Sequence, residues 1–215
     1  MAKTLEQKLT EGRQYRIIDL AGFDLREDDE MTVNGYATTF EQPYRLWEDD
    51  EFVIDEVVDR SAFDGCEMSD VIMQYDHHGR VFARNANGTL FTEPRDNGLY
   101  IEARLGGTEI GRQLYEEIRG KYTTKMSYGY KLTADGLVID EMRDSADGRT
   151  FILQRVRRIA RLYDVSAVSM PANPNTEIVA ARAAVEGAIE AARAERLAAE
   201  LRAAQIKKIK LLTKI

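Results

Sequence analysis

The chain has 215 residues, 44% of them hydrophobic, which is enough to bury a core as one domain with an appendage. Acidic residues exceed basic residues by 37 to 30, and the net charge of −7 argues against an overall nucleic-acid-binding surface. One cysteine excludes an internal disulfide and, with only two histidines, provides few ligands for a metal, so we expect a reducing compartment and no cofactor. No stretch approaches the roughly 20 apolar residues that span a bilayer, and we expect no membrane association.

From about residue 15 to residue 170, short β-forming runs alternate with turn residues, a pattern typical of a mainly β domain. The clearest predicted strands are residues 32–40, 51–58, 70–75, 98–105, 125–132 and 136–142. The segments between them that are rich in charged and turn residues, 25–30, 42–51 and 144–149, are predicted to be loops.

One helix is predicted inside this region, in the segment TEIGRQLYEEIRG (108–120). Thr108 can cap its N-terminus, and Gly120 stands where a C-terminal glycine is common. Ile110, Leu114 and Ile118 share one face at helical spacing.

A second kind of composition begins after the segment MPANPNTE, where Ala, Glu, Arg, Leu and Lys dominate. We therefore divide the chain into a domain over residues 1–178 and a helical tail over residues 179–215. Two interpretations of the tail stay open. It is either a solvated helix packed loosely on the domain or on a neighbour, or a segment for assembly or targeting.

Both histidines of the chain lie side by side in VIMQYDHHGRVFAR (71–84). If the strand continues through them, alternation places His77 on the face of Met73 and Tyr75, and His78 on the other face. His77 is then the better candidate for a general base. A histidine that only caps a strand, and a slip of one residue to His78, remain the alternatives, and a metal bound by the pair beside Asp76 is a weaker one.

Ser127, in TTKMSYGY, is the best candidate nucleophile, because alternation places it on one face with Gly129, which has no side chain. A small structural serine is the alternative. The acidic neighbours of Cys66 would raise the pKa of its thiol and weaken it as a nucleophile. Ser166 and Ser169 are rivals that lie close in sequence to the candidate acid.

That acid is Asp164, a lone carboxylate in the strand-like apolar run ARLYDVSAVSMP. A serine and histidine pair needs such a group to fix the imidazole tautomer. The alternative is a structural ion pair with a nearby arginine: Arg157, Arg158 or Arg161.

Six blocks in order resemble the prohead (procapsid maturation) serine proteases of tailed bacteriophages, which are distantly similar to the herpesvirus assemblins. They are VNGYATTF, DEVVDRSAFDG, VIMQYDHHGRVFARNANGTL, GLYIEARL, GRQLYEEIRGKYTTKMSYGYKL and LYDVSAVSMPANPNTEI. The resemblance covers roughly residues 13–180. It implies an α+β, mainly β fold: a closed or partly open β-barrel surrounded by helices. It also implies a catalytic triad of His77, Ser127 and Asp164. In the herpesvirus relatives the third residue of the triad looks like a histidine, so the aspartate of this chain is a departure from that branch.

The function implied by this resemblance is that of a serine endopeptidase of capsid maturation. Its expected partners are the scaffolding protein or the scaffolding region of the major capsid protein, and the protease itself, inside the immature shell in the host cytoplasm. We also expect a homo-oligomer of two or more copies. Two other classes stay open, a non-catalytic scaffolding or shell-binding protein with the same fold and an esterase acting on small substrates.

Overall fold

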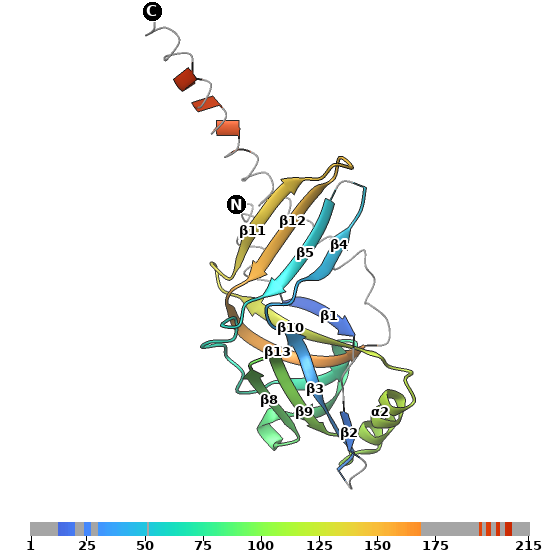
Figure 1. The fold of residues 1–215 in the computed structure, drawn as a ribbon. Helices are drawn as coiled ribbons and strands as arrows, with labels where there is room; N and C mark the ends of the chain where they lie inside the picture. The colour runs from blue at the N-terminus through green and yellow to red at the C-terminus, as the bar shows by residue number, and fades with distance from the viewer. Residues whose placement is uncertain are drawn as a thin grey trace, which may run out of the picture.

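Figure 1 shows the fold in the computed structural model, in which strands form three sheets. The structure describes residues 13–19, 24–26, 30–50 and 52–168, together with residues 194, 197–198, 201–202 and 205–207 of the tail. The mainly β class predicted from the sequence is confirmed.

The first sheet has the strand order β1-β10-β13-β6-β7. Its strands are, in that order, Gln14–Asp19, Lys125–Leu132, Ile159–Val168, Ile72–Tyr75 and His78–Arg84. β10 is antiparallel to β1 and β13, β13 is parallel to β6, and β6 is antiparallel to β7. The central position of β10 and β13 makes this sheet the frame of the site described below.

The other two sheets have four strands each. The second sheet, β2-β3-β9-β8, is antiparallel throughout and contains Asp24–Arg26, Thr32–Thr39, Gly98–Arg104 and Leu90–Arg95. The third sheet, β11-β12-β5-β4, contains Leu137–Asp144, Thr150–Val156, Phe52–Val58 and Tyr44–Glu48. Within it, β12 is parallel to β5. Figure 1 shows the third sheet at one end of the β-sheet region and the first two sheets at the other.

Closure into a barrel is not found among the described strands, because each of the three strand orders is open at both ends. Between residues 24 and 168 the described helices are α2 (Glu109–Arg119) and the short 3-10 helix η1 (Asn85–Asn87). The sheets meet through side chains instead of a continuous hydrogen-bonded ring. The part described between residues 13 and 168 therefore consists of three packed open sheets with one α-helix at the side.

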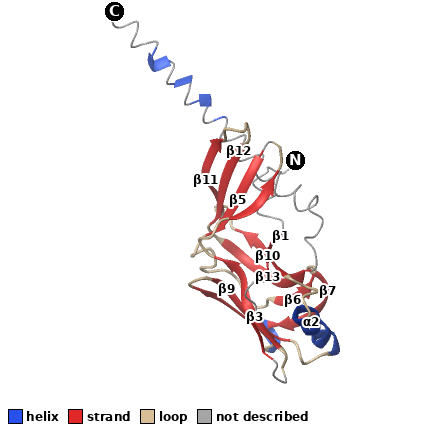
Figure 2. Cartoon of the chain, turned by 45° about the vertical axis from the view of Figure 1, so that its right-hand side comes forward, coloured by secondary structure: helices blue, strands red, loops and turns tan. Residues whose placement is uncertain are grey.

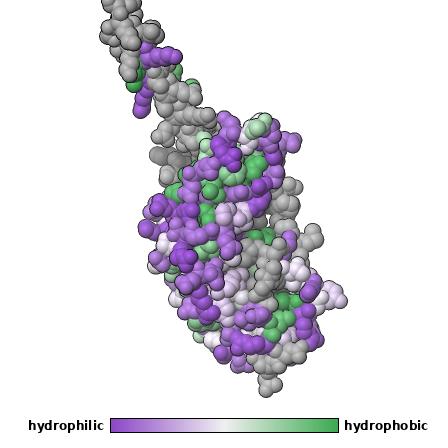
Figure 3. Space-filling view, viewed as in Figure 1, coloured by the Kyte–Doolittle hydropathy of each residue, from purple (hydrophilic) through white to green (hydrophobic). Residues whose placement is uncertain are grey.

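The main core lies between the first two sheets and α2. Its fully buried members include Val33, Leu99 and Ile101 from the second sheet, and Met73, Met126, Tyr128, Tyr130 and Val165 from the first sheet. A smaller cluster of Phe52, Ile54 and Ile152 belongs to the third sheet. The visible face is mostly hydrophilic, with limited hydrophobic areas (Figure 3).

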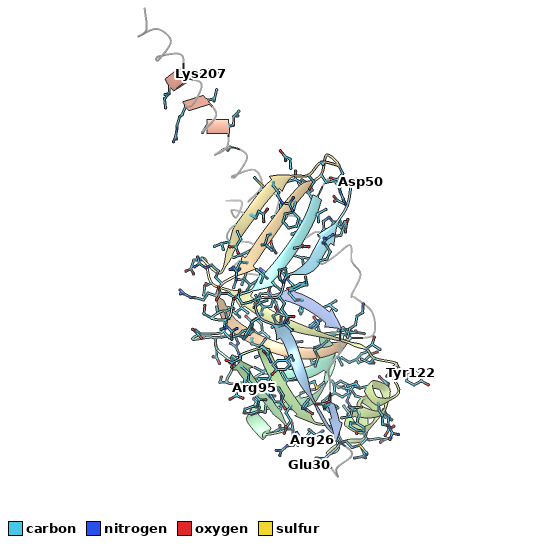
Figure 4. All side chains as sticks on the ribbon, viewed as in Figure 1. Arg26, Glu30, Asp50, Arg95, Tyr122 and Lys207 are labelled. Carbon is cyan, nitrogen blue, oxygen red and sulfur yellow. The ribbon has the colours of Figure 1, made fainter. Side chains whose placement is uncertain are left out.

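The helix predicted at 108–120 is present as α2 and lies beside β7 (Figure 2). The Thr108 hydroxyl accepts a hydrogen bond from the Gly111 backbone N–H at 3.1 Å, which confirms the N-cap. Leu114 and Ile118 are buried, as their spacing predicted. Just beyond the helix, Tyr122 is 81% exposed and points away from the body (Figure 4).

Each of the six predicted strands matches an observed strand within two residues, and two predicted loops need correction. Residues 42–51 contain β4, which pairs with β5, and residues 25–30 overlap β2. In both cases pairing with a neighbouring strand outweighs the charged and turn-forming residues of the segment. The loop at 144–149 joins β11 to β12 as predicted.

The predicted boundary at residue 178 lies outside the described residues. The tail sequence also has a stripe of apolar residues, whose first three members lie outside them too: Ile178, Val185, Ile189, Leu197 and Leu201. The described tail positions are helical. Leu197 and Leu201, from the same stripe, are 59% and 57% exposed.

Candidate active site

Three side chains predicted from the sequence meet on the first sheet. His77 Nε2 lies 2.5 Å from Ser127 Oγ, and His77 Nδ1 lies 2.6 Å from Asp164 Oδ2. The Ser127 and Asp164 side chains are fully buried, and the His77 side chain is 7% exposed. A neutral imidazole with its hydrogen on Nδ1 donates to Asp164 and accepts from the Ser127 hydroxyl. The three groups therefore form one continuous hydrogen-bonded chain.

His77 reaches this position from a turn, and the prediction that it continues the strand alternation is wrong. β6 ends at Tyr75, β7 begins at His78, and these two residues are paired. Asp76 and His77 form the two-residue turn between them with φ of 49° and 61°. Asp and His are among the residues that enter this left-handed region most readily. The Asp76 backbone N–H donates to the Ala167 carbonyl at 3.0 Å and ties the turn to β13.

Ser127 and Asp164 come together through the pairing of β10 with β13. In this register Ser127 is opposite Ser166, and Gly129 is opposite Asp164. Gly129 has no side chain, but the space where one would lie is filled. A Cβ atom on Gly129 would collide with Asp164 Oδ1 and would lie 2.7 Å from Arg13 Nε. The missing side chain gives room to the carboxylate and to an arginine.

The carboxylate of Asp164 accepts hydrogen bonds on both oxygens. Oδ1 is paired with Arg13 Nη2, and Oδ2 also accepts from the Ser166 hydroxyl. An ion pair thus exists, as one alternative proposed, but its partner is Arg13 from the N-terminal segment and not Arg157, Arg158 or Arg161. Nothing in the local sequence around Asp164 indicates this partner, because it is 151 positions away.

The surroundings of His77 favour the neutral form of its imidazole. Burial lowers its pKa, and the neighbouring Arg13 and His78 side chains lower it further, to about 3. At neutral pH the ring therefore holds a single hydrogen and has a free lone pair on Nε2 toward Ser127, which is the form a general base requires.

A family model described as Caudovirus prohead serine protease matches residues 21–190. The chain belongs to this family. The expectation of a serine endopeptidase of phage capsid maturation is therefore confirmed at the level of the family. The matched residues include His77, Ser127 and Asp164, whereas Arg13 and β1 precede the matched range.

Among solved structures, the bacteriophage T4 capsid assembly protease, gp21, is similar over 74% of this chain and 99% of that chain. The sequences are 12% identical, and the TM-score is 0.39. No curated protein matches the chain.

In this prohead protease, the rival candidates from the sequence occupy other positions. His78 is exposed, and its Nδ1 contacts the Asp76 carbonyl at 2.5 Å. The hydroxyl of Ser166 donates to Asp164. Burial raises the pKa of the Cys66 thiol to about 11, so it is protonated at neutral pH. Ser169 lies outside the described residues.

Within the part of the chain that the structure describes, no group of three His, Cys, Asp or Glu side chains is arranged to hold a metal ion. Over the same residues, none of the helices is long and apolar enough to cross a bilayer.

Proposed function

We propose that His77, Ser127 and Asp164 are the catalytic triad of this protease. The supporting observation is the position of His77, whose two ring nitrogens each lie within 2.6 Å of a partner, one a hydroxyl and the other a carboxylate. This is the arrangement in which a histidine activates a serine hydroxyl and is itself oriented by an acid.

The reaction then proceeds by acyl transfer. Ser127 Oγ attacks the scissile carbonyl carbon while its proton passes to His77 Nε2. His77 returns that proton to the amine nitrogen as the peptide bond breaks, which leaves an acyl-enzyme. A water molecule then attacks the acyl carbon while its proton passes to His77 Nε2. His77 returns that proton to Ser127 Oγ as the ester bond breaks, and the carboxylic acid product leaves. Asp164 stays a carboxylate throughout and stabilises the imidazolium in the two transition states.

The proposed substrates are the scaffolding protein or the scaffolding region of the major capsid protein, and the protease itself, inside the immature shell. Membership of the prohead protease family supports this choice of partners. The tail, residues 179–215, is proposed to bring the enzyme into the shell and to be removed later by autocleavage.

The test is to co-express the wild-type protease, or Ser127→Ala, with the major capsid protein of the same phage. The intact masses of both polypeptides are then measured. We expect wild type to give a shortened capsid protein and a trimmed protease, and Ser127→Ala to leave both at full length, since loss of a catalytic serine costs about 10⁶-fold in turnover. If shells form and both samples stay uncut, a non-catalytic scaffolding role replaces this proposal.

A further inference from the structure

Arg13, just before β1, contacts the acid of the proposed triad although it lies outside the range matched by the family model. Its guanidinium Nη2 donates to Asp164 Oδ1. The guanidinium carbon also lies 4.9 Å from the centre of the Tyr163 ring and 5.5 Å from that of the Tyr15 ring. Two aromatic rings and a carboxylate therefore hold the guanidinium in one place.

Asp164 depends on its donors because its side chain is fully buried. A buried carboxylate without partners is strongly disfavoured as an anion. His77 and Ser166 supply donors to Oδ2, and among the described residues Arg13 supplies the hydrogen bond to Oδ1. The three bonds together fix the plane of the carboxylate as well as its charge.

The N-terminal strand is arranged to deliver this arginine. β1 pairs with β10 so that Tyr15 is opposite Gly129, the residue whose missing side chain leaves room for the guanidinium. The Tyr15 ring lies 4.1 Å from the His77 ring, measured between centroids. Arg16, one residue further, is anchored to the fully buried Glu56 of β5 by hydrogen bonds of 2.5 and 2.8 Å. β1 thus joins the first sheet to the third sheet and places the Tyr15 ring against His77.

We propose that Arg13 is a positioning residue of the protease, which holds Asp164 as a carboxylate turned toward His77 so that β1 completes the active site. This inference rests on the proposed triad. It adds a residue from outside residues 21–190, the range that identifies the family.

Removal of Arg13 has a predictable electrostatic sign. The titratable groups beside Asp164 and His77 are Arg13, Tyr15 and His78, and the Tyr163 ring lies against the Arg13 guanidinium. Loss of the guanidinium removes a positive charge beside both members of the pair, so the pKa of Asp164 and the pKa of His77 both rise. More of the enzyme then carries a proton on these groups at low pH, and activity must fall most on the acid side.

The experiment measures how fast a fluorophosphonate modifies the enzyme between pH 5 and pH 9, by intact mass. In this step Ser127 Oγ bonds to phosphorus, fluoride leaves, and the hydroxyl proton passes to His77, so no peptide substrate is needed. The variants are Arg13→Met and Arg13→Lys. Arg161→Met is the matched control, because Arg161 also lies over the Tyr163 ring, at 5.1 Å, and is exposed. Circular dichroism checks that each variant is folded.

We expect Arg13→Met to lose about 10²-fold in rate at pH 9, the size of effect that a misplaced catalytic group produces. Its acid limb should also move up by roughly one to three pH units, so that the deficit grows, by up to about a further tenfold, as the pH falls toward 5. Arg13→Lys should recover most of the rate, and Arg161→Met should match wild type.

Two results would overturn the assignment of Arg13. One is a folded Arg13→Met with wild-type rates at every pH, and the other is a loss of equal size at every pH, as a purely structural role would give. A different failure identifies the proposed triad as the error: wild type that is not modified, or Ser127→Ala that is modified as fast as wild type.

Discussion

At the scale of single residues, the position of His77 depends on a backbone conformation that residues other than glycine rarely adopt. Asp76 and His77 both have positive φ in the β6-β7 turn. Such residues cost of order 1–3 kcal/mol each and persist where the surroundings hold them. The hydrogen bond from Asp76 to Ala167 is one such restraint. Sequence alternation predicted that His77 faces inward, but the left-handed turn is the actual cause, and a period-2 pattern cannot show it.

The neutral state of His77 leads to a prediction about pH. Because its pKa is lowered to about 3, the ring stays neutral through the mildly acidic range. An ordinary histidine of pKa ~6.5 would be only about one-tenth neutral at pH 5.5. The rate of fluorophosphonate modification of wild type at pH 5.5 should therefore stay within about twofold of its value at pH 7.5. A rate that falls with a midpoint at pH 6.5 or above would contradict the described environment of His77.

Gly129 gives a second test at this scale. Gly129→Ala places a methyl group against Asp164 Oδ1 and Arg13 Nε. We expect the displaced carboxylate to lower the modification rate by about 10²-fold while the protein stays folded. Gly107→Ala is the matched control, because a Cβ atom there meets nothing within 4 Å. Equal rates for the two alanine variants would show that the space above Gly129 has no part in activity.

At the scale of elements, the sequence predicts what local patterns control. The spacing of Leu114 and Ile118 and the cap at Thr108 predict α2, and alternation in residues 125–132 predicts which side chains of β10 share a face with Ser127. β4 was missed because its strand state depends on pairing with β5 and not on its own charged sequence. The contact of Arg13 with Asp164 was missed because it depends on how β1 enters the first sheet.

The attachment of β1 to the third sheet should be measurable as stability. Glu56 is fully buried and accepts hydrogen bonds from Arg16, Tyr44 and Gln154. Glu56→Ala leaves the Arg16 charge buried and unpaired, so we expect the free energy of unfolding to fall by about 3–5 kcal/mol. Urea unfolding in a Ser127→Ala background, where self-cleavage cannot interfere, measures this loss.

The control for that measurement is Glu93→Ala, which removes an exposed ion pair with Arg95. This change should cost less than about 1 kcal/mol. If Glu56→Ala and Glu93→Ala unfold at the same urea concentration, the buried network does not hold β1 in place.

At the scale of the whole molecule, the site is assembled by three neighbouring strands of one sheet. β10 supplies Ser127, β13 supplies Asp164, and the turn after β6 supplies His77. These residues are far apart in sequence, and only the strand order brings them together. The sequence alone identified His77, Ser127 and Asp164 as separate candidates. The resemblance of the ordered blocks to a protease family implied that the three act together as a triad. The packing of the sheets, with no closed barrel among the described strands, was not predictable from alternation.

We propose that the domain carries out catalysis and that the tail brings the enzyme into the shell, and these separate roles can be tested by deletion. Deletion of residues 179–215 removes no residue of the proposed triad, so the fluorophosphonate rate should stay within about twofold of wild type. The truncated enzyme should be missing from shells assembled with the capsid protein, as measured by sedimentation and quantitative mass spectrometry. Normal encapsidation would contradict a targeting role for the tail, and a lost rate would contradict the domain boundary.

The central claim is that Ser127 is the nucleophile of a His77 and Asp164 triad. Its most direct test is to modify the wild-type enzyme with a fluorophosphonate and to locate the adduct by peptide mass spectrometry. We predict one adduct, on Ser127, which disappears in His77→Ala although Ser127 is still present. An adduct on Ser166 or on another residue, or an unchanged rate in His77→Ala, would contradict the proposed active site.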